Sequence, residues 1–179
     1  MKKKLRKLLC ILLTAVLCLG IAVPASAASS KYSAATNAYY SYMRGKSGYY
    51  KIVDIDKNGV PELLINDRSK GANEIYTYNT RTRRTVRLGS IMYGKGYRMP
   101  IYYSRTSHTA MICNANTGGQ TYYLYKINGT RATRLVNGEV YNGKFQSGYS
   151  INGRKVSRTT FRKTIRKYMK NAVTVTIGQ

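Results

Sequence analysis

Acidic and amide side chains gather in one short stretch of a chain that is otherwise strongly basic. Asp54, Asp56, Asn58 and Glu62 all lie within residues 54–62, whereas the whole chain has 6 Asp and Glu against 31 Lys and Arg. Ca²⁺ is bound by roughly six to eight oxygen ligands, from carboxylates, amides and backbone carbonyls. A tightly coiled loop would turn these side chains, and the carbonyl of Val60, toward one point. The stretch therefore predicts a calcium site formed by Asp54, Asp56, Asn58, Val60 and Glu62.

The residues around these ligands predict two strands joined by a tight loop. Gly59 allows the sharp turn that a calcium loop needs, and apolar runs lie on either side, at residues 49–53 and 63–65. The loop is not an EF-hand, because Ile65 stands where that motif requires a bidentate Glu, and because its flanks are strand-like. The alternative interpretation is a simple hairpin turn, since Asp, Asn and Gly favour turns. A turn alone does not require Asp54 and Glu62.

This pattern also resembles known calcium loops. The spacing D-x-D-x-N-G-x-x-E between two strands resembles the loop of FG-GAP repeats, the repeats of integrin-type propellers. Residues 50–65 resemble a block written Y-A-L-x-D-I-D-G-D-G-x-P-E-L-L-I, which is found in uncharacterised secreted proteins of gut Firmicutes. The resemblance implies a calcium loop and no particular activity. Lys57 and Asn58 stand where that block has Gly and Asp, so we expect weak binding, with a Kd on the order of 10⁻⁴ to 10⁻³ M.

The first 27 residues predict a signal peptide. Five basic residues precede an apolar run over residues 8–23, and Ala25-Ser26-Ala27 is a small-residue cleavage site. We therefore expect a secreted protein whose mature part, residues 28–179, is a single β-rich domain with no transmembrane segment. Its only cysteine is Cys113, so no disulfide within the domain is expected. The mature protein could also remain associated with a Gram-positive cell wall.

The formal net charge of +25 indicates attraction to polyanions. Outside a Gram-positive cell, an anionic polymer such as teichoic acid is the expected partner. The alternative is that the charge only keeps the protein soluble. Nucleic acid is not expected as a specific target, because no nucleic-acid-binding signature accompanies the basic residues. The oligomeric state does not follow from the sequence.

Hydrophobic and turn patterns predict a mainly β fold with flanking helices, an α+β protein. Short alternating runs separated by Asn-Gly pairs are typical of an antiparallel meander, which could be propeller-blade-like or barrel-like. Residues 28–31 are expected to be a mobile terminus and residues 89–96 a loop. One amphipathic helix is expected near each end of the mature chain, over residues 33–44 and 157–170, followed by an edge strand at 172–177. The predicted turns are at Asn128-Gly129, Asn137-Gly138, Asn142-Gly143 and Asn152-Gly153.

Catalytic arrangements are sparse. His108 is the only histidine, and nothing in the sequence indicates that it meets Cys113 as a nucleophile pair. No zinc-ligand spacing or phosphate-binding glycine loop occurs. We therefore expect a secreted, non-enzymatic binding module with a calcium-stabilised hairpin and a basic surface. The alternatives are a cationic membrane-active protein that acts through helix 157–170, and a hydrolase that uses two carboxylates outside the loop.

Overall fold

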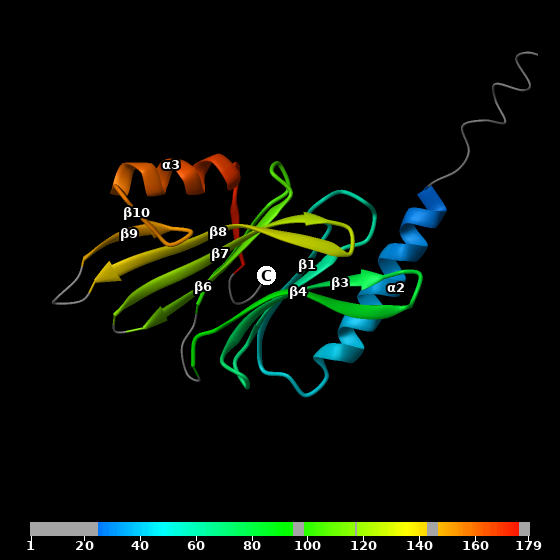
Figure 1. Cartoon of the computed structure of the whole chain (residues 1–179). Helices are drawn as coiled ribbons and strands as arrows, with labels where there is room; N and C mark the ends of the chain where they lie inside the picture. Colours follow the sequence, from blue (N-terminus) through cyan, green and yellow to red (C-terminus); the bar gives the residue numbers. More distant parts are fainter. Residues whose placement is uncertain (1–24, 95–98, 117, 143–146, 176–179) are drawn as a thin grey trace, which may run out of the picture.

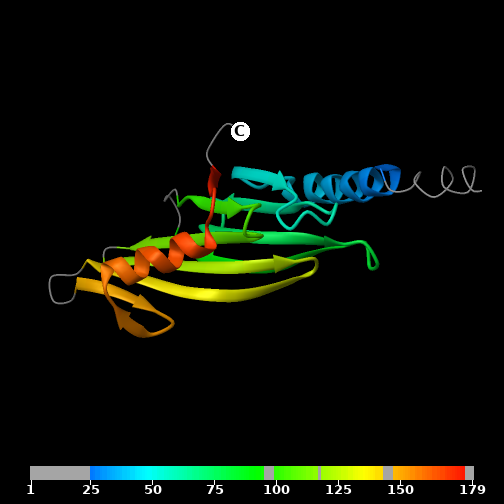
Figure 2. The same ribbon diagram turned by 90° about the horizontal axis from the view of Figure 1, so that it is seen from above.

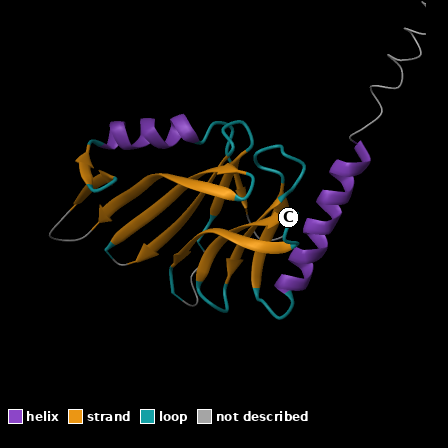
Figure 3. Ribbon diagram, turned by 45° about the vertical axis from the view of Figure 1, so that its right-hand side comes forward, coloured by secondary structure: helices purple, strands orange, loops and turns teal. Residues whose placement is uncertain are grey.

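The protein forms two antiparallel β-sheets with one helix on each outer side (Figures 1 and 3). This arrangement comes from a computed structural model, which describes residues 25–94, 99–116, 118–142 and 147–175. The predicted signal peptide therefore lies almost entirely outside the described residues. Among the described residues, no helix has the length and apolar character needed to cross a membrane.

The first sheet has four strands, and their order in the sheet follows the chain. The second sheet has seven strands in the order β10-β9-β8-β7-β6-β5-β11. It is also a meander, except that the last strand returns to pair with β5. The first sheet contains β1 (Gly48–Val53), β2 (Glu62–Asp67), β3 (Ala72–Asn79) and β4 (Arg84–Met92). The second contains β5 (Ile101–Ser104), β6 (Thr109–Asn116), β7 (Gly119–Asn128), β8 (Arg131–Asn142), β9 (Ser147–Ile151), β10 (Arg154–Val156) and β11 (Val173–Val175).

The main core lies between the two sheets, because alternate residues of a strand face opposite sides. Leu64 and Ile75 of the first sheet pack with Ile101, Ile112 and Ile127 of the second. The intervening residues of the first sheet face the other way, toward a helix. β2 is therefore buried along its whole length, which explains why its middle residues, Leu63-Leu64-Ile65, form an apolar run rather than a polar–apolar alternation.

Helix α2 (Ala25–Met43) covers the outer side of the four-stranded sheet. Its Ala35 and Tyr39 are fully buried against Leu63 and Ile65 of β2. The hydroxyl of Tyr39 donates a hydrogen bond to the carbonyl of Pro61 at 2.7 Å. This contact fixes the helix against the segment that leads from the acidic loop into β2.

Helix α3 (Arg158–Tyr168) covers the outer side of the seven-stranded sheet (Figure 2). Ser157 caps it, since the side chain of Ser157 accepts a hydrogen bond from the amide of Thr160 at 3.1 Å. Phe161 is the buried residue of this helix. Ile165 and Met169 pack in the hydrophobic cluster between the helix and the sheet. The predicted cap and apolar face of the late helix are therefore confirmed.

The structure differs from the predictions at four places. The early helix starts at Ala25, so residues 28–31 are helical; their Ala and Ser residues permit a helix. β4 continues through residues 89–92, which were predicted as a loop, because β3 pairs with it there beyond a bulge.

The pair Asn137-Gly138 lies within β8 and not in a turn. The missing side chain of Gly138 leaves room for Phe161, since an added Cβ would lie 3.0 Å from the ring of Phe161. The expected propeller-like or barrel-like closure is not confirmed, since the described strands form two open sheets.

The other predicted turns are accounted for more simply. Gly129 lies in the β7–β8 turn, and Asn152 and Gly153 form the β9–β10 turn with φ of 51° and 79°. These are left-handed values, which Asn and Gly adopt most readily. Asn142 is the last residue of β8, and Gly143 is outside the described residues. The terminal strand is confirmed as β11 (Val173–Val175) at the sheet edge, and residues 176–177 of the predicted strand lie outside the described residues.

One buried polar network connects the two sheets. Asn73 on β3 donates hydrogen bonds to the carbonyls of Met99 and Cys113, each at 3.1 Å, and accepts one from Asn66 at 2.7 Å. Asn73 is fully buried. Its amide therefore gives hydrogen bonds to two main-chain carbonyls, of which that of Met99 also accepts from Tyr49 and Asn66.

We expect Asn73→Ala to lower the free energy of unfolding by about 1–3 kcal/mol, because it removes the buried hydrogen bonds of Asn73 with Met99, Cys113 and Asn66. The measurement is urea unfolding monitored by tyrosine fluorescence. Asn128→Ala, at an exposed strand end, is the matched control and should change stability by about 0.5 kcal/mol or less. Equal effects of both substitutions would contradict a special role for Asn73.

Candidate metal centre

The acidic loop joins β1 to β2 and coils around the carboxylate of Asp54. The amides of Asn58 and Gly59 donate to the two oxygens of Asp54 at 3.1 and 2.9 Å. Lys57 and Gly59 have positive φ values, 63° and 83°, which allow the backbone to turn sharply. The turn residues therefore behave as the sequence predicts, and the loop wraps around a carboxylate.

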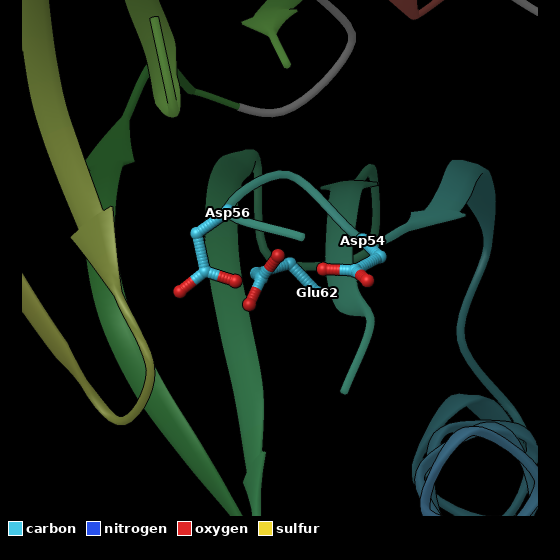
Figure 4. A group of neighbouring side chains, drawn as sticks. All are labelled: Asp54, Asp56 and Glu62. Carbon is cyan, nitrogen blue, oxygen red and sulfur yellow. The ribbon is translucent and has the colours of Figure 1, made fainter. Parts of the chain in front are cut away.

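Three carboxylates meet at this loop (Figure 4). One oxygen each from Asp54, Asp56 and Glu62 lies within 4.8 Å of the others. Asp54 and Asp56 are partly exposed, whereas Glu62 is fully buried. Carboxylates this close repel one another unless a proton or a cation lies among them.

Glu62 has the strongest electrostatic constraint. It starts β2, between α2 and the second sheet, so its carboxylate lies away from water. The amide of Ile55 donates to it at 2.9 Å, and the hydroxyl of Thr77 donates at a long 3.5 Å. Burial, followed by the negative charges of Asp56 and Asp54, raises the pKa of Glu62 from 4.5 to about 8. The site therefore holds a proton at neutral pH, or a cation that replaces it.

Asp56 connects the loop to the second sheet. One of its oxygens accepts hydrogen bonds from the amide of Gly129, at 2.6 Å, and from the side chain of Asn58, at 3.0 Å. Its other oxygen, Oδ1, is buried and has no hydrogen-bond partner. Buried polar atoms are almost always paired. An unpaired carboxylate oxygen beside two further carboxylates offers ligands of the kind that a hard cation such as Ca²⁺ binds, so these residues fit part of the ligand set of such an ion.

The other two predicted ligands are less well placed. The side-chain oxygen of Asn58 accepts a hydrogen bond from the amide of Val60 at 2.7 Å, so it is directed into its own turn. Val60 contributes its side chain to the cluster under α2. The structure thus brings together the carboxylates of Asp54, Asp56 and Glu62. The ligand roles of Asn58 and Val60 stay predictions.

Three residues near the site could not be identified from the sequence. The side chain of Arg105, in the β5–β6 turn, donates to the carbonyl of Asp54 at 2.9 Å. Gly129 and Thr77 contact Asp56 and Glu62, as described above. All three are distant from the loop in sequence. Asn128-Gly129 was recognisable as a turn, but no local pattern indicates which loop a turn will contact.

The remaining described acidic residues have partners of their own. Asp67 pairs with Lys46 at 3.2 Å, and Glu74 lies 3.4 Å from Lys70. Glu139 accepts a hydrogen bond from Ser150 at 2.8 Å. Each of these three carboxylates thus has a partner of its own, and none of them adds to the cluster of Asp54, Asp56 and Glu62.

Cys113 and His108 do not form a reactive pair in the described structure. Cys113 is buried in β6 and its thiol donates to the carbonyl of Pro100 at 2.9 Å. Burial raises the pKa of the Cys113 thiol to about 12, so the thiolate needed for nucleophilic attack does not form at neutral pH. His108 lies in the β5–β6 turn with a φ of 53°.

Comparisons of the chain with protein-family models, with curated proteins and with solved structures gave no match.

The raised pKa of Glu62 predicts a pH dependence of stability in the metal-free protein. The folded state binds the Glu62 proton more tightly than the unfolded state does. The stabilisation is therefore complete below about pH 4.5 and is lost as the pH rises toward about 8. The free energy of unfolding should fall across this interval by at most about 1.4 kcal/mol per pH unit.

Chemical unfolding at a series of pH values, with a chelator present, measures this slope. Glu62→Gln keeps the shape of the side chain and cannot ionise, so its slope between pH 5 and pH 8 should be smaller than that of the wild type. Glu139→Gln is the control and should keep the wild-type slope. A Glu62→Gln profile that matches the wild type would contradict the assignment.

Proposed function

We propose that the protein is a secreted, non-enzymatic binding module whose β1–β2 loop is ordered by Ca²⁺ and whose basic surface binds an anionic extracellular polymer. The observation that carries the proposal is the meeting of three carboxylates at one loop, one of them fully buried. Asp54, Asp56 and Glu62 would hold the ion. A bound Ca²⁺ would supply positive charge at the place where the protein has concentrated negative charge.

The position of the loop suggests what the ion would do. Asp56 contacts Gly129 of the β7–β8 turn, and the carbonyl of Asp54 accepts from Arg105 of the β5–β6 turn. The loop itself belongs to the first sheet, whereas both partners belong to the second. An ion that fixes the carboxylates would therefore also strengthen the contact between the two sheets.

A hydrolase is a weaker alternative. A glycosidase mechanism needs two carboxylates that face a substrate cleft. Asp67, Glu74 and Glu139 are each engaged with basic or hydroxyl side chains, and the other described carboxylates form the cluster. Their arrangement gives no second pair for acid–base chemistry and supports binding rather than catalysis.

A membrane-active function is also less well supported. Insertion into a lipid surface needs a helix with a free apolar face. In α3 this face is already used, because Phe161 and Met169 are buried against the second sheet. The residues that α3 exposes to solvent are all polar: Arg158, Thr159, Thr160, Arg162, Lys163, Arg166 and Lys167.

We expect Ca²⁺ to raise the thermal unfolding midpoint of residues 28–179. A ligand that binds only the folded state adds RT ln(1 + [L]/Kd) to stability, which is about 2.7 kcal/mol at a hundredfold excess over Kd. Calcium at about 10 mM should therefore stabilise the wild type by about 1–3 kcal/mol for the weak affinity that we expect. Differential scanning calorimetry in calcium and in chelator measures this shift.

Asp56→Asn is the informative variant, because its amide oxygen can still accept from Gly129 while one negative charge is lost. We expect the calcium shift to fall by at least half. Glu139→Gln removes a carboxylate outside the cluster and should keep the full shift. If calcium fails to move the wild-type midpoint, or if it moves that of Asp56→Asn equally, the loop is only a turn.

A further inference from the structure

Basic side chains cover the solvent face of α3 and have no acidic partner. Arg162, Lys163, Arg166 and Lys167 are all exposed, and no ion pair within the described residues involves them. Together with Thr159 and Lys170, they line a shallow groove along the helix. We call this surface the α3 basic face and define it as Thr159, Arg162, Lys163, Arg166, Lys167 and Lys170.

The spacing of these residues is unfavourable for an isolated helix. Arg162 and Arg166 are four residues apart, as are Lys163 and Lys167, and residues four apart are neighbours on a helix surface. Like charges at this spacing destabilise a helix by about 0.2–0.5 kcal/mol per pair. Like charges therefore repel one another along the whole length of the α3 basic face. Packing of Phe161 and Met169 beneath the helix compensates for it.

No ion pair among the described residues relieves that repulsion. β10, which precedes the helix, adds exposed Arg154 and Lys155. The nearest acidic side chain along the chain, Glu139, is bonded to Ser150. A bound polyanion would replace the missing counter-charges, and its release of counterions would favour binding.

The row of charges favours a linear partner over a compact one. Successive residues four apart rise by about 6 Å along the helix, so the groove presents positive charges at regular intervals. Arginine donates in a planar fork that matches phosphate oxygens. Beside the row, Arg162 and Arg166 also border a hollow between the helix and the sheet, floored by Met111, Tyr122 and Phe161. That floor offers apolar contact to the uncharged links of a chain.

We propose that the α3 basic face binds linear phosphodiester polymers through their backbone. This inference rests on the proposed function, since it names the surface and the polymer class through which the binding module would act. The partner needs one negative charge per repeat and no base or sugar of a particular kind. Recognition is electrostatic and therefore sensitive to salt.

The test is fluorescence anisotropy with a labelled abasic oligodeoxyribose phosphate and, in parallel, an oligothymidylate of the same length. The wild type should bind both with similar affinity. The logarithm of the association constant should fall linearly with the logarithm of the salt concentration. Arg162→Gln with Arg166→Gln should weaken binding at least about tenfold and reduce the salt slope by roughly 0.7 for each lost phosphate contact.

The matched control is Arg81→Gln with Arg84→Gln, which removes the same charge from an exposed turn and strand end. This control should keep its affinity within about twofold, because it lies outside the α3 basic face. Unchanged thermal midpoints in both double variants exclude unfolding as the cause. Gln is close to Arg in helix propensity, so α3 should persist.

Other outcomes overturn the inference in distinguishable ways. Equal weakening in both double variants would mean that the overall charge of the protein, and not the α3 basic face, binds the polymer. The proposed function would then still stand. Binding of oligothymidylate without the abasic oligomer would mean recognition of bases. Leakage from vesicles of anionic phospholipid that depends on Arg162 and Arg166 would mean a lipid partner. Binding of neither oligomer would contradict both this inference and the polymer half of the proposed function, whereas the calcium shift would still test the other half.

Discussion

The burial of Glu62 is the constraint on which the site and the packing around it both depend. β2 lies between α2 and the second sheet, so its first side chain enters the protein interior however polar it is. A buried carboxylate needs donors and a compensating charge. The fold supplies the amide of Ile55 as one donor, and it places Asp54 and Asp56 beside Glu62, which increases the need for positive charge. A proton and a bound cation would thus compete for the same place, and either would stabilise the folded protein.

Local patterns predicted much of the fold because they depend on neighbouring residues. The cap at Ser157, the apolar face of α3 and the positive-φ turn at Asn152-Gly153 are all set by residues within a few positions of one another. The predictions were wrong where the local structure depends on a residue that is distant in the sequence. Gly138 is a strand residue because Phe161 needs its space. The number of sheets could not be predicted from the sequence either. It depends on which strands pair and face each other, and pairing with a strand many residues away leaves no local pattern in the sequence.

The same division applies to the candidate site. The sequence identified Asp54, Asp56 and Glu62 as a group because all three lie within one short loop, residues 54–62. It also assigned ligand roles to Asn58 and Val60, whereas in the structure the oxygen of Asn58 accepts from its own loop. The contacts of Gly129 and Arg105 with the loop cross between sheets. These contacts give the site a structural consequence that no motif could indicate, which is the coupling of the loop to both halves of the core.

The position of β11 has a consequence for the order of folding. Val175 is part of the core between the sheets, and β11 pairs with β5, whose residues come much earlier in the chain. A chain that is synthesised from its N-terminal end cannot complete this core until β11 is available. Contacts between distant parts of a chain also form slowly, because a long loop must close before they are made. The core between the sheets therefore stays incompletely packed until β11 has been synthesised.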